Sequence, residues 1–321
     1  MEIMCENIEV MSCTALSAFG VKRAAYAVGV FDGVHLGHQK ILDNLIRLAQ
    51  QCSAEPVAVT FEPHPRTLLT PQNPPKLLMP TAERIRQIHR RGIRFVVVMP
   101  FTRQLAVKSP EEFMQQSFMN ENIKTTAITV GENWHFGAQG RGDGNFLRNY
   151  AQNHDFIFEA VPMLELDGKI ICSSLIRNLI AGGDLDEAAK MLGRPYSLFG
   201  AVEHGYGQAG GELACPTANL TLECGILPPC GVYAGVAEVE KRRYHCAINI
   251  GKSPTFKRHD GAPIRIEAHL LDFSGSLYGE NLELTLLKYL REERTFGSVE
   301  ELKRQISSDV AAIRNICGRI E

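Results

Sequence analysis

The sequence predicts an α/β fold for the first half of the chain and an antiparallel β fold, closed by a helix, for the second half. Three observations predict this: apolar runs alternate with amphipathic stretches, then short β-like runs follow between Gly and Pro, and the last stretch is amphipathic. The 321 residues favour two domains at roughly 150 residues each. We place them at residues 1–186 and 187–321, because the character of the sequence changes around residues 173–193.

In the first half, short runs rich in Val, Ala and Ile predict strands. They are residues 25–30, 56–61, 94–99, 125–130 and 156–161. Amphipathic stretches predict helices at 37–51 and 81–91, and a third helix after Ser109, which is followed by proline and two acids as in a capped first turn. Strands that are apolar throughout and alternate with helices imply a parallel sheet covered on both faces.

Two helices, 173–180 and 184–192, precede the second half. The β-like runs after them are residues 196–202, 217–222, 232–239, 244–250, 264–271 and 282–287. Gly and Pro separate these runs as in a small antiparallel barrel. A final amphipathic helix is predicted at 298–316, with Ser298 and Glu301 forming a capping box.

Composition and charge exclude several classes of protein. The 34 Lys and Arg against 36 Asp and Glu give a net charge of −2, so the chain has no overall attraction to nucleic acid or to an anionic membrane. No apolar run approaches the ~20 residues of a membrane span, and the acidic N-terminus does not resemble a secretory signal. The nine cysteines include no C-x-x-C pair, which predicts reduced thiols. We expect a cytoplasmic protein without nucleic-acid or membrane partners, and leave its oligomeric state open.

A glycine-rich turn follows the first predicted strand and opens the first predicted helix. It reads G-V-F-D-G-V-H-L-G-H over residues 29–38. Glycines let backbone N–H groups approach phosphates, and the helix N-terminus adds partial positive charge. Two imidazoles in such a turn can donate to an α-phosphoryl group, where charge builds up during nucleotidyl transfer. This predicts a nucleotide site with His35 and His38 as catalytic residues.

The turn resembles that of the H-x-G-H nucleotidylyltransferases, and three later segments resemble those of bacterial bifunctional riboflavin kinase/FAD synthetases. The segments are T-F-E-P-H-P at 60–65, V-G-E-N-W-H-F-G at 130–137 and S-S-L-I-R at 173–177. The resemblance implies a Rossmann-like FMN adenylyltransferase domain. The ATP-binding residues that it implies are Gly29, Phe31, Asp32, Gly33, Gly37, Ser173, Ser174 and Arg177. The flavin-binding residues that it implies are Phe61, His64, Pro65, Asn133, Trp134 and Phe136.

Each of these segments also has a structural interpretation. His64 between two prolines can be a rigid turn residue, and Trp134 and Phe136 can be core aromatics. Ser173 and its neighbour can be a helix cap alone, although Arg177 one turn later can hold the β- and γ-phosphates of ATP together with them. The order of all the segments along one chain favours the functional interpretation.

The second half resembles the riboflavin kinase of the same family. The segments that carry the resemblance are P-T-A-N at 216–219, N-I-G-K-S-P-T-F at 249–256 and E-A-H-L-L-D-F at 267–273. It implies that Thr217 and Asn219 hold Mg²⁺ and, with Gly210, the phosphates of ATP. It also implies that Glu267 is the general base that takes the proton of the ribityl 5′-hydroxyl. Glu267 can otherwise be a solvated strand residue, and we interpret His269, on the same strand face, as structural.

The loop before P-T-A-N departs from the family pattern. A basic residue, a glycine and a phenylalanine are usual there, whereas this chain has Gly211, Ala214 and Cys215. Backbone N–H groups of a glycine run can still cradle phosphate, but without the cation we expect weaker ATP binding.

The resemblance covers nearly the whole chain and implies two sequential reactions on small molecules. The C-terminal domain phosphorylates riboflavin to FMN with ATP, and the N-terminal domain transfers AMP from ATP to FMN, which gives FAD and pyrophosphate. Two alternatives stay open, an FMN adenylyltransferase with an impaired kinase domain and a non-catalytic flavin-binding protein. The second ranks last, because H-x-G-H and Glu267 are both intact.

Overall fold

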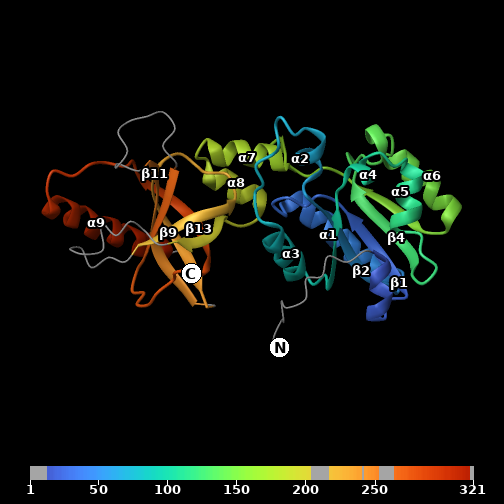
Figure 1. The fold of residues 1–321 in the computed structure, drawn as a ribbon, viewed down its shortest axis with the longest axis horizontal. Helices are drawn as coiled ribbons and strands as arrows, with labels where there is room; N and C mark the ends of the chain where they lie inside the picture. The colour runs from blue at the N-terminus through green and yellow to red at the C-terminus, as the bar shows by residue number, and fades with distance from the viewer. Residues whose placement is uncertain (1–12, 204–216, 241, 253–263, 319–321) are drawn as a thin grey trace. The chain divides into compact units, whose positions relative to one another are not determined.

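The computed structural model describes residues 13–203, 217–240, 242–252 and 264–318 (Figure 1). The chain divides into two compact units. The first holds Met1–Pro75 and Thr81–Cys172, and the second holds Lys76–Pro80 and Ser173–Glu321. The domain boundary that we expect between residues 186 and 187 stays a prediction.

Five parallel strands form the sheet of the first unit. They are β1 (Arg23–Val28), β2 (Glu55–Glu62), β3 (Phe95–Pro100), β4 (Lys124–Gly131) and β5 (Ile157–Val161), in the order β3-β2-β1-β4-β5. Each strand ends within two residues of its predicted run, so the predicted parallel sheet is confirmed. The strand order reverses between β1 and β4, and open α/β sheets bind their ligands beyond the carboxyl ends of the strands at such a point.

Helices cover both faces of this sheet. They are α1 (Leu36–Gln51), α2 (Pro65–Leu69), α3 (Thr81–Arg90), α4 (Arg103–Ala106), α5 (Pro110–Ser117) and α6 (Gly144–His154), with 3₁₀ segments η1 (Cys13–Phe19) and η2 (Ala138–Gly140) and a hairpin of β6 (Glu165–Leu166) and β7 (Lys169–Ile170). α1 buries Leu42, Leu45 and Leu48 and contacts β1, β2 and β4. The predicted cap of α5 is confirmed, since Ser109 Oγ accepts from the Glu112 N–H at 3.1 Å and the Glu112 carboxylate accepts from the Ser109 N–H at 2.8 Å.

Helix α6 was not predicted from the sequence. Asp143 caps it by accepting from the Phe146 N–H at 2.8 Å, and Leu147 and Ala151 are its buried residues. An aspartate followed three residues later by apolar positions at helical spacing is a signal for such a helix.

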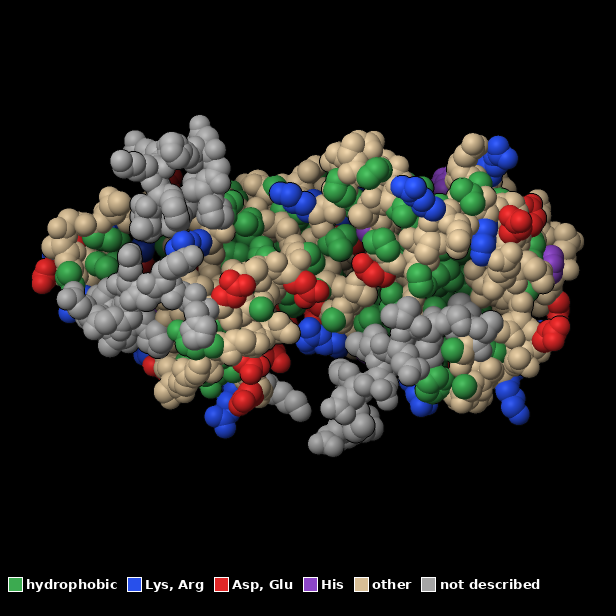
Figure 2. Space-filling view, in the orientation of Figure 1, with side chains coloured by type: hydrophobic (Ala, Val, Ile, Leu, Met, Phe, Trp, Pro, Cys, Tyr) green, Lys and Arg blue, Asp and Glu red, His purple; other side chains and the backbone are tan. Residues whose placement is uncertain are grey.

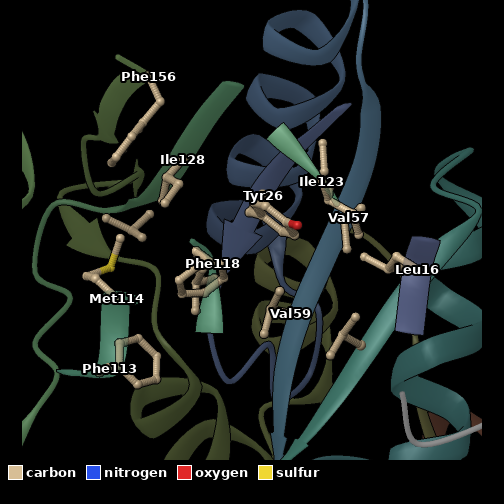
Figure 3. Packing of buried hydrophobic residues seen from close by; sticks show 14 of the residues in the cluster. Leu16, Tyr26, Val57, Val59, Phe113, Met114, Phe118, Ile123, Ile128 and Phe156 are labelled. Carbon is tan, nitrogen blue, oxygen red and sulfur yellow. The ribbon is translucent and has the colours of Figure 1, made fainter. Parts of the chain in front are cut away.

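The large core of the first unit lies on the other face of the sheet from α1 (Figure 3). Successive strand residues point to opposite faces, so Tyr26 and Val28 of β1 enter this core while Ala25 and Ala27 do not. The ring of Tyr26 meets that of Phe118 edge to face, with centroids 5.1 Å apart. Packing of this kind fixes the strand ends, and therefore the loops that leave them.

The second unit is a closed antiparallel barrel with three helices. Its strands are β8 (Tyr196–Glu203), β9 (Ala218–Cys224), β10 (Gly231–Val239), β11 (Arg242–Lys252), β12 (Ile264–Leu270) and β13 (Asn281–Arg291), in the closed order β10-β11-β12-β9-β8-β13. Its helices are α7 (Ser173–Ala181), α8 (Leu185–Leu192) and α9 (Val299–Cys317). The predicted barrel and terminal helix are confirmed, although β13 runs four residues beyond the predicted strand because Tyr289 and Arg291 still pair with β10.

The terminal helix α9 lies against β10, β11 and β13 (Figure 1). Ile313 and Cys317 bury themselves beside Ala234 of β10. The expected serine cap is confirmed, since Ser298 Oγ accepts from the Glu301 N–H at 3.2 Å. The other half of the predicted capping box, in which Glu301 would accept from the Ser298 N–H, is wrong. The Glu301 carboxylate instead accepts from the N–H of Gly297 at 3.1 Å. The S-x-x-E pattern does not choose between these two adjacent N–H donors.

The distribution of charged side chains and the state of the cysteines agree with what the composition predicts. On the face shown in Figure 2, Lys and Arg side chains of the described residues are interspersed with Asp and Glu and form no single-sign field. None of the described helices is long and apolar enough to cross a bilayer. The cysteines at positions 52, 172, 224, 230, 246 and 317 are free thiols, as predicted.

Candidate active sites

The predicted ATP turn leaves the carboxyl end of β1, beside the point where the strand order reverses. The Gly29 N–H donates to the Val59 carbonyl at 3.0 Å, which ties the start of the turn to β2. Phe31 and Val34 have φ of 53° and 38°. Non-glycine residues hold such backbone only where the surroundings enforce it, and they cluster at functional sites. Asp32, between them, is 2 % exposed.

The two histidines of the turn lie together at the N-terminus of α1. His35 caps the helix, and its Nδ1 accepts from the His38 backbone N–H at 3.3 Å. An accepting Nδ1 carries no proton, so neutral His35 keeps its proton on Nε2 as a donor. The two rings stack with centroids 3.6 Å apart, and a Cβ at Gly37 would lie 3.2 Å from the His35 ring. The structure therefore brings both predicted catalytic histidines together.

His38 is held neutral. Its burial lowers the pKa of the imidazole well below the usual 6.5, and the nearby His35 and Arg84 lower it further. The edge of Phe31 contacts its ring at a centroid distance of 5.4 Å. Within the described residues, His38 Nδ1 has no hydrogen-bond partner. A neutral imidazole has one N–H to donate, so His38 can offer a hydrogen bond without bringing a charge of its own.

We expect the folded chain to lose stability as the pH falls below about 6.5, in part through His38. Its pKa is lower in the folded than in the unfolded state, so below 6.5 the unfolded chain binds more protons and the free energy of unfolding falls, by at most about 1.4 kcal/mol per pH unit. Thermal unfolding at pH 7.5 and 5.5 measures this. Between these two pH values, the stability of the His38→Gln variant should fall less than that of the wild-type chain. An equal fall in both proteins contradicts the expectation.

Sequence reasoning missed Arg84 of α3. This side chain is 2 % exposed and donates to the carbonyl of Val30 at 2.9 Å, to that of Phe61 at 3.3 Å and to the Glu62 carboxylate at 3.1 Å. It thus joins the ends of β1 and β2, from which the turn and the next loop depart. The only sequence signal was an arginine one turn before the buried Ile88, on the apolar face of the helix.

The F-x-P-H-P loop leaves β2 and continues into α2. His64 Nδ1 accepts from the Arg66 N–H at 3.1 Å and caps this helix, which begins at Pro65. Phe61 is 5 % exposed and meets the ring of Phe101 at 5.9 Å. The contacts of these residues agree with the structural interpretation, and their flavin role stays a prediction.

The V-G-E-N-W-H-F-G loop leaves β4, the other strand at the point of reversal. Its Asn133 is exposed, while Trp134 is half-buried and stacks on Phe136, with centroids 4.5 Å apart. Phe136 is 7 % exposed and belongs to the core, and a Cβ at Gly142 would lie 2.6 Å from its ring. Phe136 is therefore a packing residue that supports Trp134, and binding of a flavin by this loop stays a prediction.

The S-S-L-I-R segment opens α7 in the second unit. Ser173 and Ser174 are in its first turn, and Arg177 Nε donates to the Lys76 carbonyl at 2.7 Å. ATP binding by these three residues stays a prediction.

A cavity of ≈ 260 Å³ lies between the outer face of the barrel and α9. Thr217, Asn249 and Glu267 line it from the barrel, and Leu302 and Ile306 line it from α9. His269 lines the same cavity, which agrees with its place two residues after Glu267. The cavity thus joins an apolar wall to a row of oxygen-bearing side chains, as a site for a flat amphipathic ligand does.

Strand register places the polar side chains in one row. Glu267 of β12 is directly opposite Asn219 of β9 on one side and Asn249 of β11 on the other. Opposed residues of an antiparallel pair share a face, and Thr217 is two positions before Asn219. The structure therefore brings the predicted Glu267, Asn219 and Thr217 together. Gly210, with the departures at 211, 214 and 215, lies outside the described residues.

An ion pair holds α9 over this cavity. Arg291 of β13 donates to both carboxylate oxygens of Asp309, with Nη2 2.8 Å from Oδ2 and Nε 3.2 Å from Oδ1. Gln305 donates to the same carboxylate at 2.7 Å. A planar guanidinium that meets a carboxylate in this way fixes geometry as well as adding energy.

Comparisons with known proteins match both parts of the chain to enzyme families. Residues 20–175 match the FAD synthetase family and residues 192–317 match the riboflavin kinase family. A protein of Pseudomonas fluorescens named bifunctional riboflavin kinase/FMN adenylyltransferase is 37% identical over 89% of this chain and 91% of its own length. The chain belongs to the bifunctional riboflavin kinase/FMN adenylyltransferase family. A member from Bacillus subtilis is 34% identical over 89% of this chain and 90% of its own.

The fold is also that of a solved structure. A crystal structure described as a macrolide-efflux protein from Streptococcus pneumoniae is 30% identical, has a TM-score of 0.80 and covers 91% of this chain and 94% of its own. The likeness therefore includes both the parallel sheet and the barrel. For this member of the bifunctional family, the H-x-G-H turn belongs to the FAD synthetase part and Glu267 to the riboflavin kinase part.

Proposed function

We propose that this chain carries out both reactions for which its relatives are named: it phosphorylates riboflavin to FMN and then adenylylates FMN to FAD. The observation that carries the proposal is the presence of two separate sites, the stacked His35 and His38 in the first unit and the row around Glu267 in the second. A cytoplasmic location without nucleic-acid partners belongs to the same proposal, in keeping with the net charge of −2.

One incubation tests the proposal against its alternatives. The purified chain is mixed with riboflavin, ATP and Mg²⁺, and riboflavin, FMN and FAD are separated over time. We expect FMN to appear first and FAD to follow. FAD from supplied FMN without FMN from riboflavin indicates an adenylyltransferase with an impaired kinase domain. Flavin binding without either product indicates a non-catalytic protein.

In adenylyl transfer, a phosphate oxygen of FMN bonds to the α-phosphorus of ATP. The bond from that phosphorus to the bridging oxygen breaks, and pyrophosphate leaves with the electron pair. FMN supplies the nucleophile, so the protein needs only donors toward the charge that develops on the α-phosphoryl oxygens. His35 Nε2–H and neutral His38 supply such donors beside the N-terminus of α1, which favours anions.

In the kinase reaction, the ribityl 5′-hydroxyl oxygen bonds to the γ-phosphorus of ATP, the bond to the β,γ-bridging oxygen breaks and ADP leaves. Glu267 accepts the hydroxyl proton as the bond forms. The cavity supports this role, because the flavin ring can lie against Leu302 and Ile306 while the ribityl chain reaches Glu267.

The oxygen donors around Glu267 fit Mg²⁺. Thr217 and Asn219 offer a hydroxyl and an amide oxygen beside a carboxylate, the hard ligands that this ion accepts while keeping several waters. No cluster of three or more His, Cys, Asp or Glu suited to a metal occurs in the described part of the chain. Thr217 and Asn219 would therefore share the ion with ATP, and when bound it supplies neutralisation of phosphate charge.

A cation at position 211 is expected to strengthen ATP binding by the kinase domain. Arg gives phosphate a charge-assisted pair of hydrogen bonds, so Gly211→Arg should lower the ATP KM for FMN formation roughly tenfold, or about 1–2 kcal/mol. Steady-state ATP titrations measure this, and Gly211→Ala controls for backbone strain. An unchanged KM, or one raised in the arginine variant alone, contradicts an electrostatic deficit in this loop.

A further inference from the structure

Asn249 of β11 is held by a carboxylate that sequence reasoning did not single out. Its Nδ2 donates to Glu293 Oε1 at 3.1 Å, and both residues line the kinase cavity. A carboxylate only accepts hydrogen bonds, so this contact decides which end of the Asn249 amide is NH₂ and which is the carbonyl. Glu293 therefore sets the orientation of the Asn249 side chain.

Glu293 can take this place because residue 251 has no side chain. A Cβ built at Gly251 would lie 1.7 Å from Glu293 Oε1, 2.0 Å from Cδ and 2.3 Å from Oε2. Gly251 is absent from the described residues with positive φ, so the backbone there does not require glycine. Glycine at position 251 therefore leaves the space that the Glu293 carboxylate occupies.

The carbonyl end of the Asn249 amide lacks a donor. Its Oδ1 is shielded from solvent and has no hydrogen-bond partner among the described residues. Asn249 is directly opposite Glu267, and such neighbours have Cβ atoms about 4.5–5.5 Å apart. An unpaired buried acceptor is costly, so a donor that arrives with the substrate is favoured there.

We propose that Glu293 is a positioning residue of the kinase site: it holds Asn249 so that Oδ1 accepts a hydrogen bond from the ribityl hydroxyl next to the one that is phosphorylated. This rests on the proposed function of the cavity. The adjacent Glu267 takes the reacting 5′-hydroxyl, and the next donor along the ribityl chain is the 4′-hydroxyl. The N–H of the flavin ring is at the other end of the substrate, away from this pair.

A double-mutant cycle tests the proposal. Gly251→Ala and Glu293→Ala should each lower kcat/KM for riboflavin about tenfold, the first because the new Cβ displaces the carboxylate and the second because it removes it. The double variant should be no worse than either single variant, because both act on one contact. Glu293→Gln should restore most of the activity, since its Oε1 can accept from Nδ2. Glu292→Ala, a neighbouring exposed acid outside the cavity, is the matched control.

A second substrate separates positioning from general damage. With 4′-deoxyriboflavin the losses in Gly251→Ala and Glu293→Ala should nearly vanish, because the hydroxyl that Oδ1 accepts from is gone. Additive losses, or equal losses with both flavins, overturn the proposal. Circular dichroism and a thermal unfolding curve like those of the wild-type chain show that the barrel of each variant is folded. If the wild-type chain makes no FMN, the proposed function fails, and fluorescence titration with riboflavin then decides the inference: Gly251→Ala should raise Kd about tenfold, and an unchanged Kd overturns it.

Discussion

The Glu267→Gln variant is expected to form FMN about 10²–10⁴ times more slowly than the wild-type chain, the usual range for loss of a general base. Glutamine keeps the volume of the side chain and can still accept a hydrogen bond, but it cannot take the proton of the ribityl hydroxyl. Initial rates of FMN formation at saturating riboflavin and ATP measure the effect. Adenylylation of supplied FMN should continue at the wild-type rate, because Glu267 and His38 belong to different units.

The effect should fall on kcat rather than on riboflavin KM, since proton transfer occurs in the transition state. A matched control is Glu238→Gln, an exposed acid of β10 that does not line the cavity. It should leave FMN formation unchanged. An FMN rate near wild type in Glu267→Gln removes this residue from catalysis and leaves it as a polar neighbour of Asn219 and Asn249.

Much of the fold follows from local pattern. Short runs rich in β-branched residues, such as 56–61 and 125–130, favour a buried strand over a helix, so their positions could be predicted closely. The order of the strands could not be predicted from local pattern, because the neighbouring strands β1 and β4 are about 100 residues apart in the sequence. Helix α6 was missed although Asp143 and the apolar positions that follow it carry a local signal for a helix start.

In the candidate sites too, some residues could be predicted from local sequence and others could not. The H-x-G-H turn and Glu267 lie in contiguous motifs, so the sequence suffices to name them. Arg84 could not be assigned to a site, because the carbonyls of Val30 and Phe61 meet only after β1 and β2 pair. Glu293 is in no motif, and its partners at 249 and 251 come from another strand. Residues proposed to position a site through contacts between strands are therefore harder to predict than the residues of its motifs.

The His38→Ala variant is expected to lose FAD formation roughly 10²–10³-fold while FMN formation from riboflavin continues. Removal of a donor that meets charge only in the transition state has an effect of this size. The change also removes the ring that stacks on His35 at 3.6 Å and contacts Phe31. His35 then loses a contact that holds its own donor in position. Rates of FAD formation from supplied FMN and ATP measure the loss.

A matched control distinguishes catalysis from loss of a histidine in general. His154 is exposed at the end of α6 and stacks on Tyr150, and His154→Ala should leave FAD formation unchanged. His38→Gln keeps an N–H donor of similar reach and should retain more activity than His38→Ala. Because burial keeps His38 neutral, wild-type activity should not fall as the pH rises from 7 to 8, as it would if a charged imidazolium were the donor. Parallel loss of FMN and FAD formation in His38→Ala, with an unchanged unfolding curve, would contradict two independent sites.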